Sequence, residues 1–96
     1  MVVHLALFSW KDSVSQKEIN DLMGSIRELK NKIPYIIELY AGENFSKWNE
    51  GYTHAVVVTT KDRSGLDCYR NHPSHVPIAN LVDSMKEKAI GIDFEQ

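Results

Sequence analysis

The sequence has a single cysteine, Cys68, among its 96 residues, so an internal disulfide is excluded and a reducing compartment fits. Eleven basic and thirteen acidic side chains give a formal net charge of -2 without a basic block, which argues against nucleic-acid binding. The apolar run in MVVHLALFSWKD is too short to span a bilayer and lacks the flanks of a signal peptide. We therefore expect a cytoplasmic protein with neither a nucleic-acid nor a membrane partner.

The chain also lacks internal repeats, linkers and low-complexity stretches, so we predict a single domain over residues 1–96. Hydrophobic residues make up 43% of it and charged residues 25%, which is ordinary for a globular protein with one core. Four histidines, His4, His54, His72 and His75, are the main candidates for a functional site.

Alternating and helical hydrophobic patterns divide the chain into four strands and a broken set of helices. The predicted strands are Val2–Lys11, Tyr35–Ala41, Tyr52–Thr60 and Ala89–Phe94. Ser15 and Glu18 have the spacing of a capping box, followed by a helix that runs to about Lys32 and stops before Pro34. Its apolar positions recur at helical spacing: Ile19, Leu22, Met23, Ile26, Leu29 and Ile33.

The second helical region is predicted in two parts, a short helix over Asp62–Arg70 and a longer one from about Ser74 to Lys88. The apolar positions expected to be buried in the longer helix and just after it are Val76, Ala79, Val82, Met85 and Ala89. The run Lys86-Glu87-Lys88 is interpreted as solvated charge at the helix end.

This order of elements predicts an α+β fold of the ferredoxin-like β-α-β-β-α-β type, with helices on one face of the sheet. The first strand is nevertheless apolar on both faces, with Val3, Leu5 and Leu7 opposite His4, Ala6 and Phe8. Leaving the uncovered face in water would expose a large apolar surface. We therefore predict a homodimer in which two sheets pack face to face.

Strand alternation also predicts where the histidines point. If Val3, Leu5 and Leu7 meet the partner, His4 lies under the helices, and His54 joins it if the third strand has the matching register. Tyr69 ends the short helix and His75 begins the long one. The gap between the sheet and the broken helix could then gather His4, His54, Tyr69 and His75 around one cavity.

Several pieces of the sequence together resemble the stress-responsive A/B barrel (Dabb) family of dimeric α+β barrels. They are His4, Ile33-Pro34, Gly42, Gly51-Tyr52-Thr53-His54, Tyr69, His72-Pro73-Ser74-His75-Val76 and Ile92-Asp93-Phe94. The resemblance covers nearly the whole chain in order and implies two ferredoxin-like subunits that close a barrel. It also implies, from a cofactor-free polyketide cyclase of the family, a general base at His75 and a hydrogen-bond donor at Tyr69.

The same resemblance implies a pocket for a small apolar or polyketone-like ligand. Its expected lining comprises the histidines of the first and third strands and further side chains around them: His4, His54, Phe8, Leu22, Ile26, Tyr40, Val56 and Asp93. Chemically, a neutral histidine could remove a proton from a carbon flanked by carbonyls, and a tyrosine could donate to the oxygen that becomes negative. Neither step requires a cofactor.

The same residues also allow other interpretations. His72, beside Pro73, is expected to be a helix-junction residue, and His4 and His54 could simply hydrogen-bond each other or Asp93. His72 and His75 could share a helical face as metal ligands, but no Cys, Asp or Glu stands at a recognisable ligand spacing, so we predict no metal site. Three functional classes follow: a small-molecule binding protein, a cofactor-free lyase or cyclase, and a structural stress-protective assembly protein.

Overall fold

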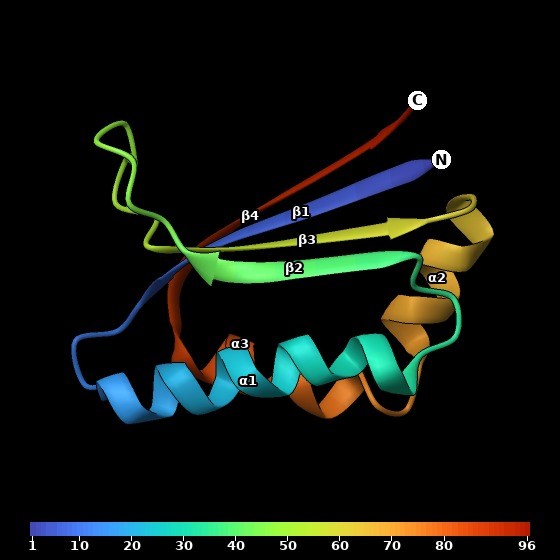
Figure 1. Cartoon of the computed structure of the whole chain (residues 1–96). Coiled ribbons are helices and arrows are strands. Elements are labelled where there is room, and N and C mark those ends of the chain that lie inside the picture. The colour runs from blue at the N-terminus through green and yellow to red at the C-terminus, as the bar shows by residue number, and fades with distance from the viewer.

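The computed structural model describes residues 1–96 as an antiparallel four-stranded sheet with three helices against one face (Figure 1). The strand order is β2-β3-β1-β4, so the first and third strands are central. The elements are β1 (Val2–Trp10), α1 (Gln16–Lys32), β2 (Glu38–Glu43), β3 (His54–Thr60), α2 (Arg63–Asn71), α3 (Val76–Met85) and β4 (Lys86–Glu95). The predicted ferredoxin-like α+β fold, with its second helix divided in two, is confirmed.

Helix α1 forms as its sequence signals predict. Ser15 accepts a hydrogen bond from the Glu18 backbone N–H, and the Glu18 carboxylate accepts one from the Ser15 N–H, which completes the capping box. The helix ends at Lys32, because Ile33 precedes Pro34 and takes an extended backbone conformation. All six predicted apolar positions of this helix are buried.

The break between α2 and α3 is built around His72 and Pro73. His72 caps the end of α2 with an extended backbone, as expected for a residue before proline. Its ring nitrogen Nδ1 accepts a hydrogen bond from the Ser74 N–H at 3.0 Å. The prediction that His72 is a helix-junction residue is therefore confirmed, and this junction presents His75 at the start of α3.

The boundary between the last helix and the last strand was predicted wrongly. Helix α3 ends at Met85, and β4 begins at Lys86, three residues before the predicted start of the strand. Lys86 is extended because it pairs with Trp10 of β1, and this cross-strand pairing continues to Glu95. Ala89 consequently lies on the sheet, and Val76 is exposed, so only Val82 and Met85 of the expected apolar stripe are buried.

Two other strand boundaries shift for local reasons. Strand β2 begins at Glu38 rather than Tyr35, because a turn after Pro34 lets the Ile36 N–H donate to the Ile33 carbonyl. Strand β3 begins at His54 rather than Tyr52, whose N–H instead donates to the Asn49 carbonyl in the preceding loop. None of the three helices combines the length and the apolar character needed to cross a membrane.

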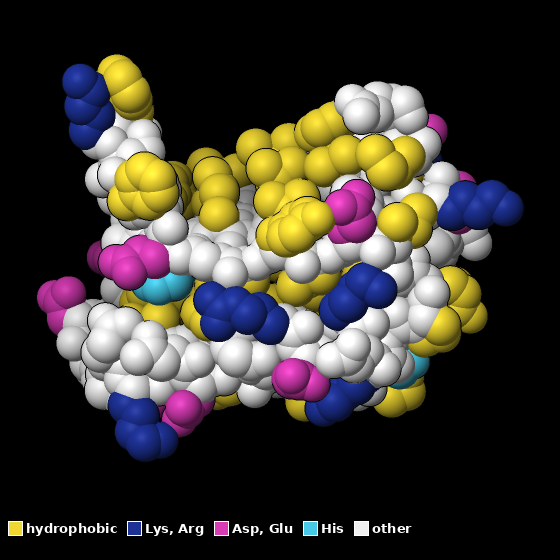
Figure 2. Space-filling view, in the orientation of Figure 1, with side chains coloured by type: hydrophobic (Ala, Val, Ile, Leu, Met, Phe, Trp, Pro, Cys, Tyr) yellow, Lys and Arg dark blue, Asp and Glu magenta, His cyan; other side chains and the backbone are white.

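The sheet face opposite the helices is strongly apolar and uncovered. Ile90, Ile92 and Phe94 of β4 are each 40–46% exposed, and they pair with Leu7, Leu5 and Val3 of β1. Figure 2 shows hydrophobic side chains along this side of the molecule, above the layer that contains the helices. A surface of this kind on a small protein is typical of an interface, which agrees with the predicted sheet-to-sheet pairing.

Candidate functional site

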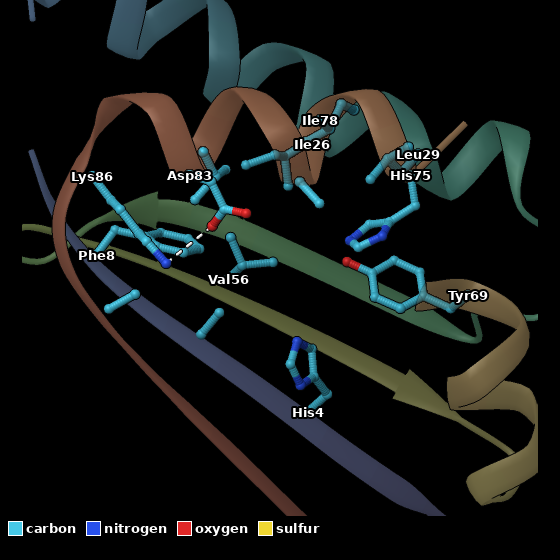
Figure 3. A pocket seen from close by; sticks show the side chains of 14 residues that line it. His4, Phe8, Ile26, Leu29, Val56, Tyr69, His75, Ile78, Asp83 and Lys86 are labelled. Carbon is cyan, nitrogen blue, oxygen red and sulfur yellow. Dashed lines mark ion pairs between the residues drawn. The ribbon is translucent and has the colours of Figure 1, made fainter. Parts of the chain in front are cut away.

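A cavity of about 170 Å³ lies between the helix-covered face of the sheet and helices α1 and α3 (Figure 3). Most of its lining is apolar, and its polar side chains belong to two groups, one on each side of the cavity in Figure 3. The lining residues are His4, Ala6, Phe8, Ile26, Leu29, Val56, Tyr69, His75, Ile78, Ala79, Val82, Asp83, Lys86 and Ala89.

His75 is oriented by the backbone of the preceding helix. Its Nδ1 lies 2.9 Å from the Arg70 carbonyl oxygen, which can only accept, so Nδ1 carries the proton that donates this hydrogen bond. In the neutral imidazole Nε2 then holds the free lone pair. Burial is the main cause that lowers the pKa of His75 below 6.5. The hydrogen bond to the Arg70 carbonyl raises this pKa, and electrostatic interactions with His4 and the Arg70 charge lower it further. His75 is therefore neutral at pH 7 and able to accept a proton.

Tyr69 lies directly against His75. The two ring centroids are 4.4 Å apart with planes inclined at 48°, and Tyr69 is only 4% exposed. Burial raises the pKa of Tyr69 to about 12, and the Arg70 charge offsets this only in part. The phenol thus stays protonated at any physiological pH. Its hydroxyl points toward the cavity in Figure 3.

His4 is held from behind by Asp93. The His4 Nδ1 and the Asp93 Oδ1 are 2.5 Å apart, across the pairing of β1 with β4. The Arg70 guanidinium donates to the other carboxylate oxygen, also at 2.5 Å. Burial works to raise the pKa of Asp93, but the hydrogen bonds from His4 and Arg70 outweigh it and lower the pKa. An ionised Asp93 fixes the Nδ1–H form of His4, so its Nε2 is the nitrogen left for the cavity.

His54 does not line the cavity, although it lies on the predicted sheet face. Its Nδ1 accepts a hydrogen bond from the Trp10 indole N–H at 2.9 Å, and the Thr53 hydroxyl lies 2.9 Å from the same nitrogen. His54 is 7% exposed, and burial is the main cause that lowers its pKa, with Glu43 raising it and Arg27 lowering it. A neutral histidine with its acceptor nitrogen occupied is a structural residue, so its assignment to this cavity is corrected.

The remaining predicted lining residues divide between the cavity and other places. Phe8, Ile26 and Val56 line it. Leu22 is 1% exposed and packs within the core rather than against the cavity. The prediction that Tyr40 lines the cavity is wrong. Tyr40 lies on the open face, because it pairs with Val57, whose side chain points away from the helices. Asp93 stands behind His4 and does not line the cavity.

Sequence reasoning missed several lining residues. Ala6 lies on the same face of β1 as His4, and Leu29 lies on the apolar face of α1, so the hydrophobic pattern could have predicted both as lining residues. Asp83 and Lys86 were not predicted to line the cavity, because Lys86 was interpreted as solvated charge at a helix end. Its ammonium instead lies beside the cavity and 3.0 Å from Asp83 Oδ1. No three His, Cys, Asp or Glu side chains are arranged so that they could hold a metal ion.

The family model for the Stress responsive A/B Barrel Domain matches residues 2–96. The chain belongs to the stress-responsive A/B barrel family. The chain is 30% identical to olivetolic acid cyclase from Cannabis sativa, over 97% of this chain and 94% of that protein. It is 31% identical to the stress-response A/B barrel domain-containing protein HS1 from Arabidopsis thaliana, over 98% of this chain and 88% of that protein.

Solved structures of similar proteins give the same fold as this A/B barrel chain. The Arabidopsis thaliana protein At3g17210 superposes with a TM-score of 0.90 at 30% identity, covering 100% of this chain and 95% of that one. A protein from Bacteroides fragilis, described as dimeric and ferredoxin-like and of unknown function, superposes at 0.80 with 27% identity, over 99% and 95% of the two chains. This relative is described as dimeric, which supports the homodimer predicted from the apolar open face of this A/B barrel chain.

Proposed function

We propose that this A/B barrel protein is a homodimer that binds a small, mostly apolar carbonyl compound in the cavity that ends at His75 and Tyr69. The observation that carries the proposal is the pairing of a neutral imidazole with a protonated phenol at one end of a mostly apolar cavity. The Tyr69 hydroxyl points toward the cavity (Figure 3), where a ligand oxygen can accept a hydrogen bond from it.

The size of the cavity restricts the ligand. At about 170 Å³ it is smaller than the roughly 300–1,000 Å³ of sites for drug-sized molecules. A compact ligand with a short apolar body suits it better than an extended chain. The A/B barrel relative named as a cyclase of olivetolic acid supports a carbonyl-containing ligand class without defining the ligand of this chain.

A second candidate function is a cofactor-free, base-catalysed reaction at the same place. His75 Nε2 would take a proton from the carbon next to a carbonyl, and the electron pair of that C–H bond would pass to the carbonyl oxygen as an enolate. Tyr69 would donate its hydroxyl proton in a hydrogen bond to that oxygen. If the enolate carbon attacks a second carbonyl of the same molecule, the proton on His75 returns to the new alkoxide. Atoms and charge then balance without a co-reactant.

The neutral state of His75 favours this candidate. A base is useful near pH 7 only when most of it is unprotonated, and burial lowers the pKa of His75 in this direction. The role of His4 would be to orient the ligand carbonyl with its Nε2 side, since Asp93 holds the Nδ1 side. A dimer without ligand chemistry, acting as a structural stress-protective assembly, is the outcome if neither binding nor exchange is found.

The experiment uses 1-phenyl-1,3-butanedione, a compact diketone whose central carbon is acidic. Binding is followed by the imidazole NMR signals of His75 and His4, and base chemistry by deuterium incorporation at the central carbon in heavy water. His75→Ala and Tyr69→Phe are compared with Tyr35→Phe, a tyrosine that is 47% exposed and lies outside the cavity.

Binding that persists in His75→Ala with loss of catalysed exchange would establish the enzyme. Binding in the wild type without exchange above the solvent rate would leave the binding function alone. If the imidazole signals of His75 and His4 do not respond to the diketone or to related small ketones, the cavity is not a ligand site and the structural function gains support.

A further inference from the structure

The cavity has a second polar end that the proposed function leaves unexplained. Asp83 and Lys86 lie on the side away from His75 and Tyr69, with Phe8 beside the lysine (Figure 3). Their place in the chain explains the separation, because His75 caps the start of α3 and Lys86 caps its end. A ten-residue helix is about 15 Å long, so the backbones of His75 and Lys86 stand at opposite ends of the cavity.

The lysine is unusual because it does not extend freely into solvent. Its side chain is 36% exposed, about half the exposure of Asp83 at 67%, and it lines a cavity whose other side chains are mostly apolar. The aliphatic stem can cover apolar surface while the ammonium stays near the cavity mouth. The same residue begins β4 with an extended backbone, and the pairing with Trp10 of β1 therefore fixes the point from which this stem projects.

The partner of the lysine is readily replaced. Asp83 and Lys86 are three residues apart at the end of a helix, and the exposed carboxylate is mostly hydrated. Ion pairs of this kind contribute little, because water competes for both charges. A carboxylate brought by a ligand from inside the cavity would meet the ammonium on its less hydrated side, while Asp83 could turn to water.

We propose that Lys86 selects ligands that carry a carboxylate at the end remote from the carbonyl, so that the preferred class is short keto acids. This inference rests on the proposed function, since it names the ligand class of the same cavity. In this arrangement the ketone faces His75 and Tyr69, the carbon chain lies against Phe8, Ile26 and Val56, and the carboxylate meets Lys86. Asp83 then tunes affinity, because it competes with the ligand for the ammonium.

The test compares 6-oxoheptanoate with 6-oxoheptanamide, which have the same carbon skeleton and differ in charge. Titrations are followed by NMR signals of cavity residues at about pH 8, where His75 is neutral because burial lowers its pKa below 6.5. The wild type should bind the acid roughly tenfold more tightly than the amide, the size expected for one charge-assisted hydrogen bond.

Two substitutions give opposite expectations. Lys86→Met keeps an unbranched apolar stem and removes the charge, so acid binding should weaken until the preference for the acid over the amide disappears. Asp83→Asn removes the carboxylate that competes for the ammonium, so the preference for the acid over the amide should increase about threefold to tenfold. Thermal unfolding of each variant verifies that it is folded before the titrations are compared.

The possible failures are distinguishable. Equal binding of acid and amide in the wild type, or an acid preference that survives Lys86→Met, overturns the role of Lys86 and leaves the cavity as a ligand site. Tighter binding of the matched amine, 7-amino-2-heptanone, would mean that Asp83 recognises a cation and would also overturn it. If none of the three compounds shifts the signals of cavity residues, the inference and the proposed function both fail.

Discussion

The rings of Tyr69 and His75 lie in contact, with centroids 4.4 Å apart, although Tyr69 belongs to α2 and His75 is the N-cap of α3. Burial affects the two groups in opposite ways, since it raises the pKa of the phenol to about 12 and lowers the pKa of the imidazole. A hydrogen-bond donor that stays protonated is thereby placed beside a base that stays neutral.

Replacing Tyr69 by Phe should slow catalysed deuterium exchange by about 10²–10³-fold, the usual effect of losing one donor to a developing oxyanion. Diketone binding should weaken much less, because the ring that packs on His75 is retained. Exchange rates and NMR titrations of the same sample separate the two effects. An exchange rate within about twofold of the wild type would remove Tyr69 from the mechanism.

The pH dependence of exchange should report His75. The rate should rise as pH increases through the His75 pKa, which lies below 6.5, and then stay level through neutral pH because the base is already unprotonated. The fall at high pH should come only near the Tyr69 pKa of about 12, where the donor is lost. An exchange profile whose lower limb lies above pH 7 would contradict the assignment of His75 as the base.

Asp93→Asn should destabilise the protein near pH 7, because it removes the carboxylate that joins His4 to Arg70. The pKa of Asp93 is lowered on folding, so the stability it provides is present above the unfolded value of 3.8 and is lost as pH falls through the folded value. Urea unfolding at several pH values should show the difference between variant and wild type shrinking below about pH 4.

Asp21→Asn is the matched control for that measurement. Asp21 pairs with Lys17 one turn away on the surface of α1, at 2.7 Å, and both side chains are more than half exposed. Its replacement should change stability by less than about 0.5 kcal/mol. If Asp93→Asn behaves like this control at pH 7, the bridge between β1, β4 and α2 is unimportant for the fold.

The buried His54 should make the protein less stable in mild acid. Its folded pKa is lowered, chiefly by burial, so the unfolded chain binds a proton more readily and stability falls as pH decreases from 6.5 through the folded pKa. His54→Asn removes the titrating group while leaving an acceptor for the Trp10 indole. The variant should lose part of the decline in unfolding free energy between about pH 7 and 5. An unchanged slope would show that His54 does not titrate on unfolding.

Ile92→Lys should convert the dimer to a monomer, because a charge would be placed at the centre of the apolar open face, opposite Leu5. Leu81→Lys is the matched control, since Leu81 is 45% exposed against 44% for Ile92 but lies on α3, on the helical side. Solution mass by light scattering at micromolar concentration should halve for Ile92→Lys only. A mass of one chain for the wild type would disprove the dimer.

Helix α1 and the sheet faces were predictable because their signals are local. The capping box, the apolar spacing and Pro34 together specify both ends of α1 within a few residues of sequence. Alternation along β1 placed His4 and Phe8 under the helices, and both line the cavity. The His72–Pro73 junction, which brings His75 over Tyr69, was also predictable because its signal is local in the sequence.

Tertiary structure decided the features that depend on contacts between residues distant in the chain. Lys86 could have continued a helix, but pairing with Trp10 made it the first residue of β4 and brought its ammonium to the cavity. Asp93 meets His4 across 89 positions of sequence, and the indole of Trp10 occupies the acceptor of His54 across 44. The sequence by itself determined the fold class and which faces are apolar, through short-range periodicity. Strand register and side-chain packing, which arise only when distant segments meet, decided which histidines face the cavity and which charges stand at its ends.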